Sequence, residues 1–409
     1  MLLLGLLFFT TKSMAEEWPK WLGPNGNGVS TQEGLLDQWP QGGPEKVWSA
    51  HVGRGFSSPI GFDGKVYLLS MQGSNDVLTA FDAATGKVVW SQGQTVTHRA
   101  DQPQARNDDN GLPLPLATPA IDHDRIYTYG GGGDLVCRKL SDGKKLWAIN
   151  ILDQMHTQIL GWNQASSPLV DEKYVYVQGG QDGPIAIAVD KQSGKIGWTS
   201  QGKGLSGYAA PIMIDVHGAR QLIVLGGDTL FAMNPDNGAT IWTFPWKTDY
   251  DVNAATPVYR DGHLFISSGY GHGCAMLTVD ATSANELWHN TEVTCKFQPP
   301  ILSGDRLYAN SAGRLKCLQW PTSKVLWKNN DVKLREGGTI VLAGNKMIAM
   351  SEDGTLSLLR INDDGTSVVS EAHLFDGDNV WSMPLIYRGN LYATGGDELV
   401  CLKITSQQK

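Results

Sequence analysis

The stretch Asp82-Ala-Ala-Thr-Gly-Lys-Val-Val-Trp90 predicts a tight turn followed by a short strand that ends in a large aromatic residue. The Asp82 carboxylate can accept hydrogen bonds from backbone amides ahead of it, and Gly86 supplies the positive φ that such a turn needs. The β-branched pair Val88-Val89 favours a strand. Leu78 to Phe81 alternates like the strand that enters the turn. The stretch is therefore a hairpin corner whose Trp lies four residues beyond its Gly.

The same spacing recurs along the chain. Five further units have a small residue and, four positions later, a Trp: Gly143 and Trp147, Gly194 and Trp198, Gly238 and Trp242, Ala284 and Trp288, Ser323 and Trp327. A seventh unit has Val369 where the Trp is expected. An eighth unit begins at Pro384 and ends at Ile404, without an outer strand.

A second marker precedes the units, namely a small residue and Pro ahead of an apolar strand. The marker residues are Pro59, Pro119, Pro168, Pro211, Pro257, Pro300 and Pro384, with Ile340 in one unit. Seven steps separate Pro59 from Pro384, so each step is about 46 residues, the length of a four-stranded propeller blade. The sequence therefore predicts an all-β fold, an eight-bladed β-propeller of four-stranded antiparallel blades.

The two ends of the repeat region complement each other. Glu45 to Trp48 resembles an outer strand with its terminal Trp, placed ahead of any complete blade. The eighth blade lacks such a strand. Pairing the two would close the ring and remove exposed strand edges. We therefore expect residues 44–405 to form the propeller.

The N-terminal region has two parts. Leu2 to Phe9 is an apolar run too short to span a bilayer, and Ser13-Met14-Ala15 offers the small residues of a cleavage site. Residues 1–15 are expected to be a signal peptide; a tail buried in the fold is the alternative, since a basic n-region is missing. No Cys precedes Cys137, so no lipid-modified Cys is expected. Residues 16–43 should form an extension across the propeller wall.

Charge and length limit the functional classes. The 409 residues include 33 Lys and Arg against 41 Asp and Glu, and the basic residues are scattered, so nucleic acid is not an expected partner. Each blade of a repeat array packs only on its neighbours, so the length requires no second domain. We expect a soluble periplasmic or secreted monomer without a transmembrane segment in its mature form.

Long loops should gather on one face of the propeller. The loops between second and third strands and those that link successive blades emerge on what we call the linking face, and the hairpin turns emerge on the opposite turn face. The long linking-face segments are residues 91–116, 148–165, 244–254 and 270–273. Irregular loops on a rigid scaffold are where binding groups usually reside.

Aromatic and polar residues in these loops are candidates for binding a ligand near the axis. Such a ring would suit a polar organic ligand, a glycan or a protein partner. An ordinary solvated loop explains the composition of the first segment equally. The candidate ligand-binding residues are Arg106, Asn107, Trp162, Asn163, Tyr208, Lys296, Arg335 and Trp381.

Asp249, Asp251 and Asn253 form a separate candidate. Alternate residues of an extended segment share a face, so three oxygen donors would converge as Ca²⁺ requires. The segment lacks the Gly at position six and the Glu at position twelve of a calcium loop. A hydrogen-bonded corner is therefore favoured over a metal site.

The five cysteines divide by position. Cys137, Cys317 and Cys401 occupy third-strand positions where other blades have Ala, so we expect small buried residues too far apart to bond. Cys274 and Cys295 should both lie at the linking face, where either a disulfide or two thiols is compatible with a secreted chain. The sequence has no metal-binding Cys spacing, Ser/His/Asp set or paired carboxylates.

The repeated Asp-x-x-Thr-Gly-Lys-x-x-Trp unit resembles the repeat of the pyrroloquinoline-quinone (PQQ) family of β-propellers, from Pro44 to Ile404. The segments from Trp18 to Val29 and from Pro245 to Pro257 are similar to parts of secreted single-domain members. The resemblance implies the fold and says little about function, because one fold hosts many functions.

Two branches of that family imply different functions. Quinoprotein alcohol dehydrogenases use PQQ and Ca²⁺ at the axis, with a catalytic Asp and a disulfide between adjacent cysteines, whereas this chain has no adjacent Cys pair. The outer-membrane assembly propeller, which is lipid-anchored, has a similar size, binds protein partners and needs no cofactor. We expect a non-catalytic binding or scaffold protein. The alternative is a PQQ- and calcium-dependent alcohol or sugar dehydrogenase with Asp251 as base and Asn253 as calcium ligand.

Overall fold

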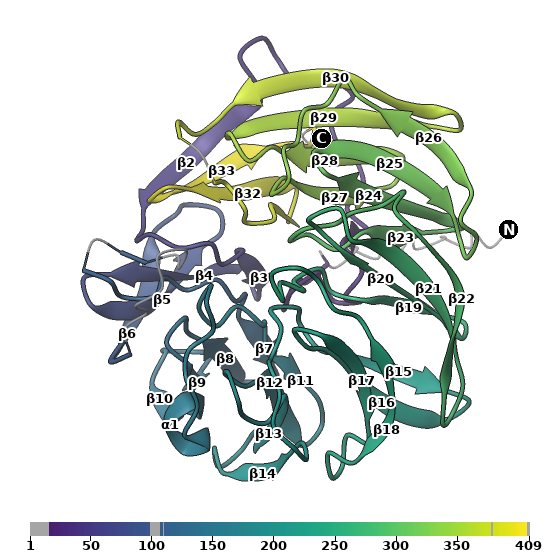
Figure 1. The fold of residues 1–409 in the computed structure, drawn as a ribbon. Helices are drawn as coiled ribbons and strands as arrows, with labels where there is room; N and C mark the ends of the chain where they lie inside the picture. The colour runs from purple at the N-terminus through teal and green to yellow at the C-terminus, as the bar shows by residue number, and fades with distance from the viewer. Residues whose placement is uncertain (1–15, 99–106, 109, 378, 407–409) are drawn as a thin grey trace, which may run out of the picture.

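A computed structural model describes residues 16–98, 107–108, 110–377 and 379–406 of the chain. Across these residues the strands form eight sheets arranged in a ring (Figure 1). Each sheet has four antiparallel strands, and one of the eight carries a fifth strand that pairs parallel. One short helix, α1 (Ile151–Met155), lies in a linking segment of the same described part. The predicted all-β, eight-bladed propeller is confirmed.

Each blade is built from consecutive strands. From the innermost to the outermost strand, blades 1 to 4 contain β3 (Ile60–Phe62), β4 (Lys65–Gln72), β5 (Asn75–Asp82) and β6 (Val88–Thr95); β7 (Ala120–Asp122), β8 (Arg125–Tyr129), β9 (Asp134–Lys139) and β10 (Lys145–Asn150); β11 (Leu169–Val170), β12 (Tyr174–Gln178), β13 (Ala186–Asp190) and β14 (Ile196–Thr199); and β15 (Ile212–Val216), β16 (Ala219–Leu225), β17 (Thr229–Met233) and β18 (Thr240–Pro245). Blades 5 to 8 contain β19 (Val258–Arg260), β20 (His263–Ser268), β21 (Gly273–Val279) and β22 (Ala284–Asn290); β23 (Ile301–Ser303), β24 (Arg306–Ser311), β25 (Arg314–Gln319) and β26 (Val325–Asn329); β27 (Thr339–Ala343), β28 (Lys346–Met350), β29 (Thr355–Asn362) and β30 (Gly365–His373); and β31 (Leu385–Tyr387), β32 (Asn390–Gly395), β33 (Glu398–Lys403) and β2 (Glu45–His51).

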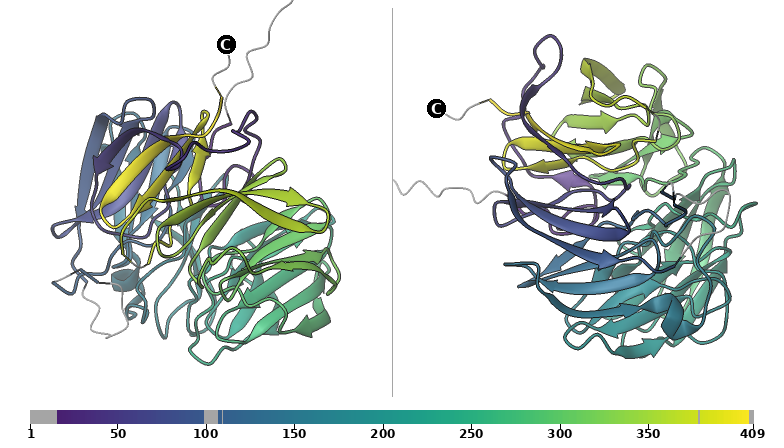
Figure 2. Two further views of the ribbon diagram at one scale, coloured as in Figure 1. Left: turned by 90° about the horizontal axis from the view of Figure 1, so that it is seen from above. Right: turned by 90° about the vertical axis from the view of Figure 1, so that its left-hand side faces the viewer.

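The eighth blade takes its outer strand from the beginning of the propeller region. Strand β2 pairs antiparallel with β33, and Trp48 lies opposite Cys401. Figure 2 shows purple β2 alongside yellow β33 in both views. The edge that β33 would otherwise leave open is therefore covered by strand pairing.

The Trp at the end of an outer strand packs on the turn of the next blade. A Cβ atom built on Gly143 would lie 2.5 Å from the Trp90 ring, and the Trp90 Nε1–H donates to the Leu140 carbonyl oxygen at 3.1 Å. Trp48, Trp147 and Trp198 repeat this contact on the turns at Gly86, Gly194 and Gly238. The glycine thus provides both the positive φ and the space for the indole.

The boundary between blades 4 and 5 lacks the turn glycine and uses a hydrogen-bond relay instead. Trp242 donates from Nε1 to the Gln221 Oε1 at 2.9 Å. The Gln221 Nε2 then donates to the Asp280 and Ala281 carbonyl oxygens at 3.1 and 3.0 Å. The Gln221 side chain thus connects the Trp242 indole to the turn of the next blade, whereas Trp90 donates to its turn directly.

The path of residues 18–30 corrects the expectation that this extension crosses the wall. Trp18 exchanges two backbone hydrogen bonds with Gly61 on innermost strand β3. Strand β1 (Val29–Ser30) pairs parallel with innermost strand β27. The inner strands expose unpaired backbone groups to the axial channel, and an extended segment satisfies some of them. Residues 35–43 then lie against blades 7 and 8, where the Leu36 N–H donates to Ile404.

Candidate functional site

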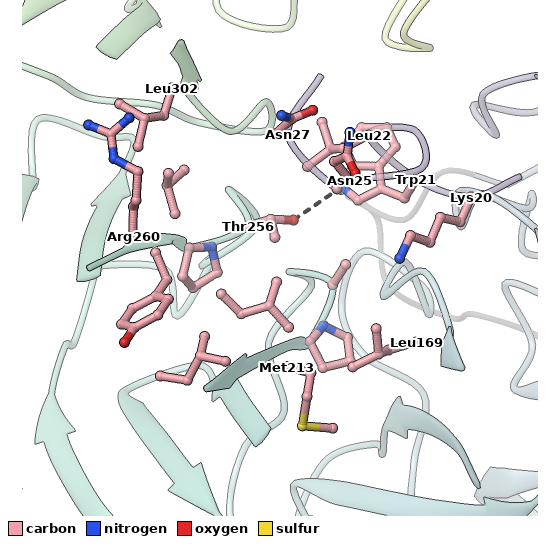
Figure 3. Close-up of a pocket in the computed structure, with 18 of the residues that line it drawn as sticks. Lys20, Trp21, Leu22, Asn25, Asn27, Leu169, Met213, Thr256, Arg260 and Leu302 are labelled. Carbon is pink, nitrogen blue, oxygen red and sulfur yellow. Dashed lines mark hydrogen bonds between the residues drawn. The ribbon is translucent and has the colours of Figure 1, made fainter. Parts of the chain in front are cut away.

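Two cavities lie on the propeller axis, on opposite sides of Trp21. The linking-face cavity has a volume of about 110 Å³, and the turn-face cavity has a volume of about 560 Å³. The Trp21 ring lines both cavities, together with Ser167, Ala210 and Thr256. The Trp21 Nε1–H donates to the Thr256 Oγ1 at 3.2 Å (Figure 3). This hydrogen bond positions the indole between the two spaces.

The linking-face cavity has a lining that repeats from blade to blade. The chain enters each innermost strand beside the axis, so equivalent positions ahead of the marker Pro reach the same space. Residues three positions before it are Phe56, Leu116, Ala165, Tyr208, Ala254, Phe297 and Trp381. Residues one position before it are Ser58, Thr118, Ser167, Ala210 and Thr256.

Trp381 is the central aromatic residue of this lining. Its ring lies 4.8 Å from the Phe56 ring and 4.7 Å from the Phe297 ring, at interplanar angles of 30° and 40°. The Trp381 Nε1–H donates to the Glu352 Oε1 at 2.8 Å. In blade 7 the equivalent position is Gly337, where an added Cβ would lie 2.3 Å from the Trp381 ring. Trp381 therefore fills space that belongs to two blades.

The structure brings together three of the predicted ligand-binding residues. Trp162, Tyr208 and Trp381 line the linking-face cavity, and the Trp162 N–H donates to the Tyr208 hydroxyl at 3.3 Å. Burial raises the pKa of Tyr208 to about 12, so the phenol is neutral at physiological pH. Lys296 lies beside the Phe297 ring, and its Nζ is 2.6 Å from the Glu336 Oε2.

Other predicted residues lie away from that cavity. Asn163 is buried and lines neither axial cavity, and its role in ligand binding stays a prediction. It occupies a left-handed turn at φ 67°, and its N–H donates to the Leu160 carbonyl oxygen at 3.0 Å. Asn107 and Arg335 do not line either axial cavity. Arg106 lies outside the described residues.

Two aromatic residues of the cavity were absent from the sequence-based candidates. Phe56 and Phe297 share with Tyr208 and Trp381 the position three residues before the marker Pro. That offset is the signal that could have identified them. Trp21 carried no comparable signal, because its position depends on the path of the extension through the channel.

The segment at residues 249–253 does not fit a calcium site. The Asn253 Nδ2 donates to the carbonyl oxygens of Gly226, Gly227 and Trp246, and its Oδ1 accepts from the Ser268 hydroxyl at 2.6 Å. The amide is buried and holds a backbone corner, so its oxygen is already used. Asp251 occupies a left-handed turn at φ 53° and Asp249 is exposed.

The linking-face cavity also does not fit a multi-ring cofactor. Ligand pockets for molecules of that size have volumes of roughly 300–1,000 Å³. The space above Trp21 measures about 110 Å³ and is surrounded by aromatic rings. The donor set and the volume therefore both fit PQQ with Ca²⁺ poorly.

The structure resolves the two alternatives left open for the linking-face cysteines. Cys274 and Cys295 are buried and free, so the disulfide is not formed. The Cys274 thiol donates to the Asn290 Oδ1 at 3.4 Å, and the Ser267 hydroxyl accepts from the Cys295 N–H at 2.9 Å. Burial raises the pKa of Cys274 to about 11 and that of Cys295 to about 12, so both thiols stay protonated.

Two buried carboxylates form a pair that sequence reasoning missed. Asp76 is the second residue of β5, and Asp134 is the first residue of β9 in the next blade. Three of their carboxyl oxygens lack a hydrogen-bond partner: both oxygens of Asp76 and the Oδ2 of Asp134. Burial raises the pKa of Asp76 well above its usual value, and the charge of Asp134 raises it further. A Cβ atom added to Gly130 would lie 2.0 Å from the Asp76 Oδ2. Only a glycine at position 130 therefore leaves room for the Asp76 side chain.

Comparison with known proteins places this geometry in a family. The family model described as outer membrane protein assembly factor BamB matches residues 36–109 and 106–329. The chain belongs to the BamB family of PQQ-like propellers. BamB of Burkholderia pseudomallei strain K96243 is 26% identical over 365 residues, which cover 84% of this chain and 83% of that protein.

Solved structures share the fold. BamB from Moraxella catarrhalis aligns with a TM-score of 0.61 and 18% identity, covering 89% of this chain and 99% of that one. Quinohemoprotein alcohol dehydrogenase ADHIIG from Pseudomonas putida HK5 aligns with a TM-score of 0.65 and 14% identity, covering 96% and 81%. At these identities the likeness shows the fold alone. Among the described residues no helix is long and apolar enough to cross a membrane.

Proposed function

We propose that this chain is a non-catalytic binding or scaffold propeller of the periplasm or cell exterior that binds a protein partner as a monomer. In this proposal residues 1–15 direct export, residues 16–43 form the extension and residues 44–405 form the propeller. Membership of the BamB family supports a protein partner, since its family description is that of an assembly factor. The surface proposed for the partner is the linking face, and a glycan is the second candidate ligand there.

The observation that carries the proposal is a continuous set of aromatic side chains on the linking face. We call it the aromatic arc: Phe56, Trp381, Phe297, Tyr270 and Tyr250. The Lys296 Nζ lies 4.7 Å from the centre of the Tyr270 ring and 5.2 Å from that of the Phe297 ring. It thereby connects the three rings around Trp381 with the two tyrosine rings. The Tyr250 side chain is 67% exposed and its ring lies 4.8 Å from that of Tyr270. Partly exposed aromatic residues are the side chains that most often dominate protein interfaces.

The buried chemistry supports a non-catalytic role. Both linking-face thiols are held protonated by burial, and the Asn253 amide is consumed by backbone contacts. A redox cofactor would have to supply any dehydrogenase chemistry, because these side chains cannot. The proposal therefore assigns the linking face to recognition.

A photo-crosslinking experiment tests the partner. A benzoylphenylalanine in place of Tyr250 should label one discrete protein in an envelope extract, and the same group in place of Lys87 on the turn face should not. The additional substitution Trp381→Ala should reduce the Tyr250 adduct at least tenfold. Equal labelling from both positions would remove the linking-face proposal. An adduct that resists protease and is removed by glycosidase would assign the surface to a glycan.

The dehydrogenase alternative has its own test. We expect no dye-linked turnover of alcohols or sugars after reconstitution with PQQ and Ca²⁺, because the donor set and the linking-face cavity fit them poorly. PQQ-dependent oxidation that disappears in Asp251→Ala would overturn the scaffold proposal.

A further inference from the structure

The N-terminal extension fills only part of the axial channel on the turn face. It pairs with β3 through Trp18 and with β27 through β1, and the Ile121 N–H of blade 2 donates to the Pro19 carbonyl oxygen. The innermost strands of blades 3 to 6, namely β11, β15, β19 and β23, line the remaining space with residues 20–29 on the other side (Figure 3). This space is the turn-face cavity of about 560 Å³.

The charge of the turn-face cavity is opposite to that of the protein. The whole chain has a formal net charge of −8. The described residues that line the cavity nevertheless include two cations, Lys20 and Arg260, and neither Asp nor Glu. A cavity of this composition favours an anion.

Lys20 is the cation that is available to a ligand. Its side chain is directed into the cavity from the extension (Figure 3). Burial lowers the pKa of the Lys20 ammonium, and no other group outweighs that effect. Arg260 is engaged differently: its guanidinium donates to the Gly304 carbonyl oxygen and lies 5.6 Å from the Trp320 ring.

Apolar side chains contribute about half of the cavity lining. Leu169, Met213, Val258 and Leu302 extend from four successive blades, and the marker prolines add further carbon surface. Figure 3 shows Leu169 on the same side of the view as Lys20, with Met213 farther from the Lys20 ammonium. The volume falls within the range of small-molecule sites. An ammonium beside these apolar side chains suits a ligand with one anionic end and a hydrocarbon body.

We propose that the turn-face cavity binds an amphiphilic monocarboxylate, with its carboxylate on the Lys20 ammonium and its hydrocarbon body against Leu169 and Met213. A charge-assisted hydrogen bond in a partly desolvated site is stronger than the same bond in water. The proposal is independent of the linking-face function, because Lys20, Leu169 and Met213 do not belong to the aromatic arc.

Titration calorimetry with decanoate and decanol tests the carboxylate requirement. Wild-type protein should bind decanoate at least tenfold more tightly than decanol, since only decanoate carries the anion. Lys20→Met keeps the length and apolar stem of the side chain, so it should weaken decanoate at least tenfold and leave decanol unchanged. The matched control Lys87→Met, in an exposed turn, should change neither affinity.

A second variant tests the location. Met213→Trp should fill the cavity and weaken both ligands, while Tyr250 photo-crosslinking stays as in the wild type. Equal affinity for decanoate and decanol, or unchanged decanoate binding in Lys20→Met, would overturn the proposal. Absence of decanoate binding below its micelle concentration would do the same. Comparison of melting temperatures in each variant separates loss of the site from loss of the fold.

Discussion

At the residue scale, Asp76 is a buried carboxyl group in an unfavourable electrostatic environment. Its side chain is 5% exposed and both oxygens lack hydrogen-bond partners. Burial raises the pKa of Asp76, so the folded protein binds a proton more tightly than the unfolded chain does. Stability must therefore fall as pH rises through the window between the unfolded pKa near 3.9 and the raised folded value.

Asp76→Asn removes that charge and should stabilise the protein at neutral pH. We expect a gain of about 1–3 kcal/mol at pH 7 in urea unfolding, and a gain that disappears below about pH 4, where Asp76 is protonated in both states. Asp82→Asn is the matched control with the opposite sign. The Thr85 hydroxyl and backbone N–H lower the pKa of Asp82, so its contribution is present above the unfolded pKa and is lost as pH falls. Gains of equal size at pH 4 and pH 7 would contradict the account of Asp76.

A second prediction concerns the contact between Gly337 and the Trp381 ring. Gly337→Ala should displace the Trp381 ring, because the new Cβ would lie 2.3 Å from it. The expected readout is a shifted Trp381 indole resonance and a weaker Tyr250 adduct. Gly365→Ala is the control, since a Cβ there meets no atom within 4 Å. An unchanged Trp381 resonance in Gly337→Ala would show that the ring does not depend on this gap.

The sequence predicts side-chain chemistry at this scale only where the repeat fixes the position. Tyr208 and Trp381 are identifiable because each precedes a marker Pro by the same number of residues. The pair Asp76 and Asp134 is not, because the two residues lie in different blades and become neighbours only after the blades pack. The burial of Asn163 in a left-handed turn could not be predicted either, because no repeat position determines it.

At the scale of the strand, the outer-strand Trp is the main connector between neighbouring blades. Trp198 is buried, packs on Gly238 and donates to the Pro235 carbonyl oxygen at 2.8 Å. Trp198→Ala should cost about 3–5 kcal/mol, because it leaves a cavity between blades 3 and 4. Trp198→Phe keeps most of the apolar contact and loses the hydrogen bond, so a smaller loss of about 1 kcal/mol is expected. Denaturant titration measures both, and equal stability of the three proteins would exclude the inter-blade role.

The spacing of turn Gly and Trp made the blades predictable, since local turn chemistry and strand periodicity determine each hairpin. The same reasoning predicted that β2, which precedes the first complete blade, is the outer strand of the eighth blade and pairs with β33. It did not find the channel path of residues 18–30. That path depends on the unpaired edges of β3 and β27, which exist only in the assembled ring.

At the scale of the whole molecule, the extension and β2 have separable roles. Deletion of residues 16–49 should expose the edge of β33 and cause aggregation, because an open strand edge is a template for pairing. Deletion of residues 16–30 retains β2, so this protein should remain monomeric while its two axial cavities merge. Light scattering distinguishes the two proteins. A monomeric 16–49 deletion would show that β2 is not needed to protect the ring.

The pairing of β2 with β33 also determines when the molecule can finish folding. The two partners are the first and last strands of the propeller ring, so all the strands between them must be synthesised before the two can meet. Contacts between residues so distant in sequence carry the largest loop-closure cost and form late. During synthesis the earlier blades therefore form an unclosed array, and the ring can close only once β33 is available to β2.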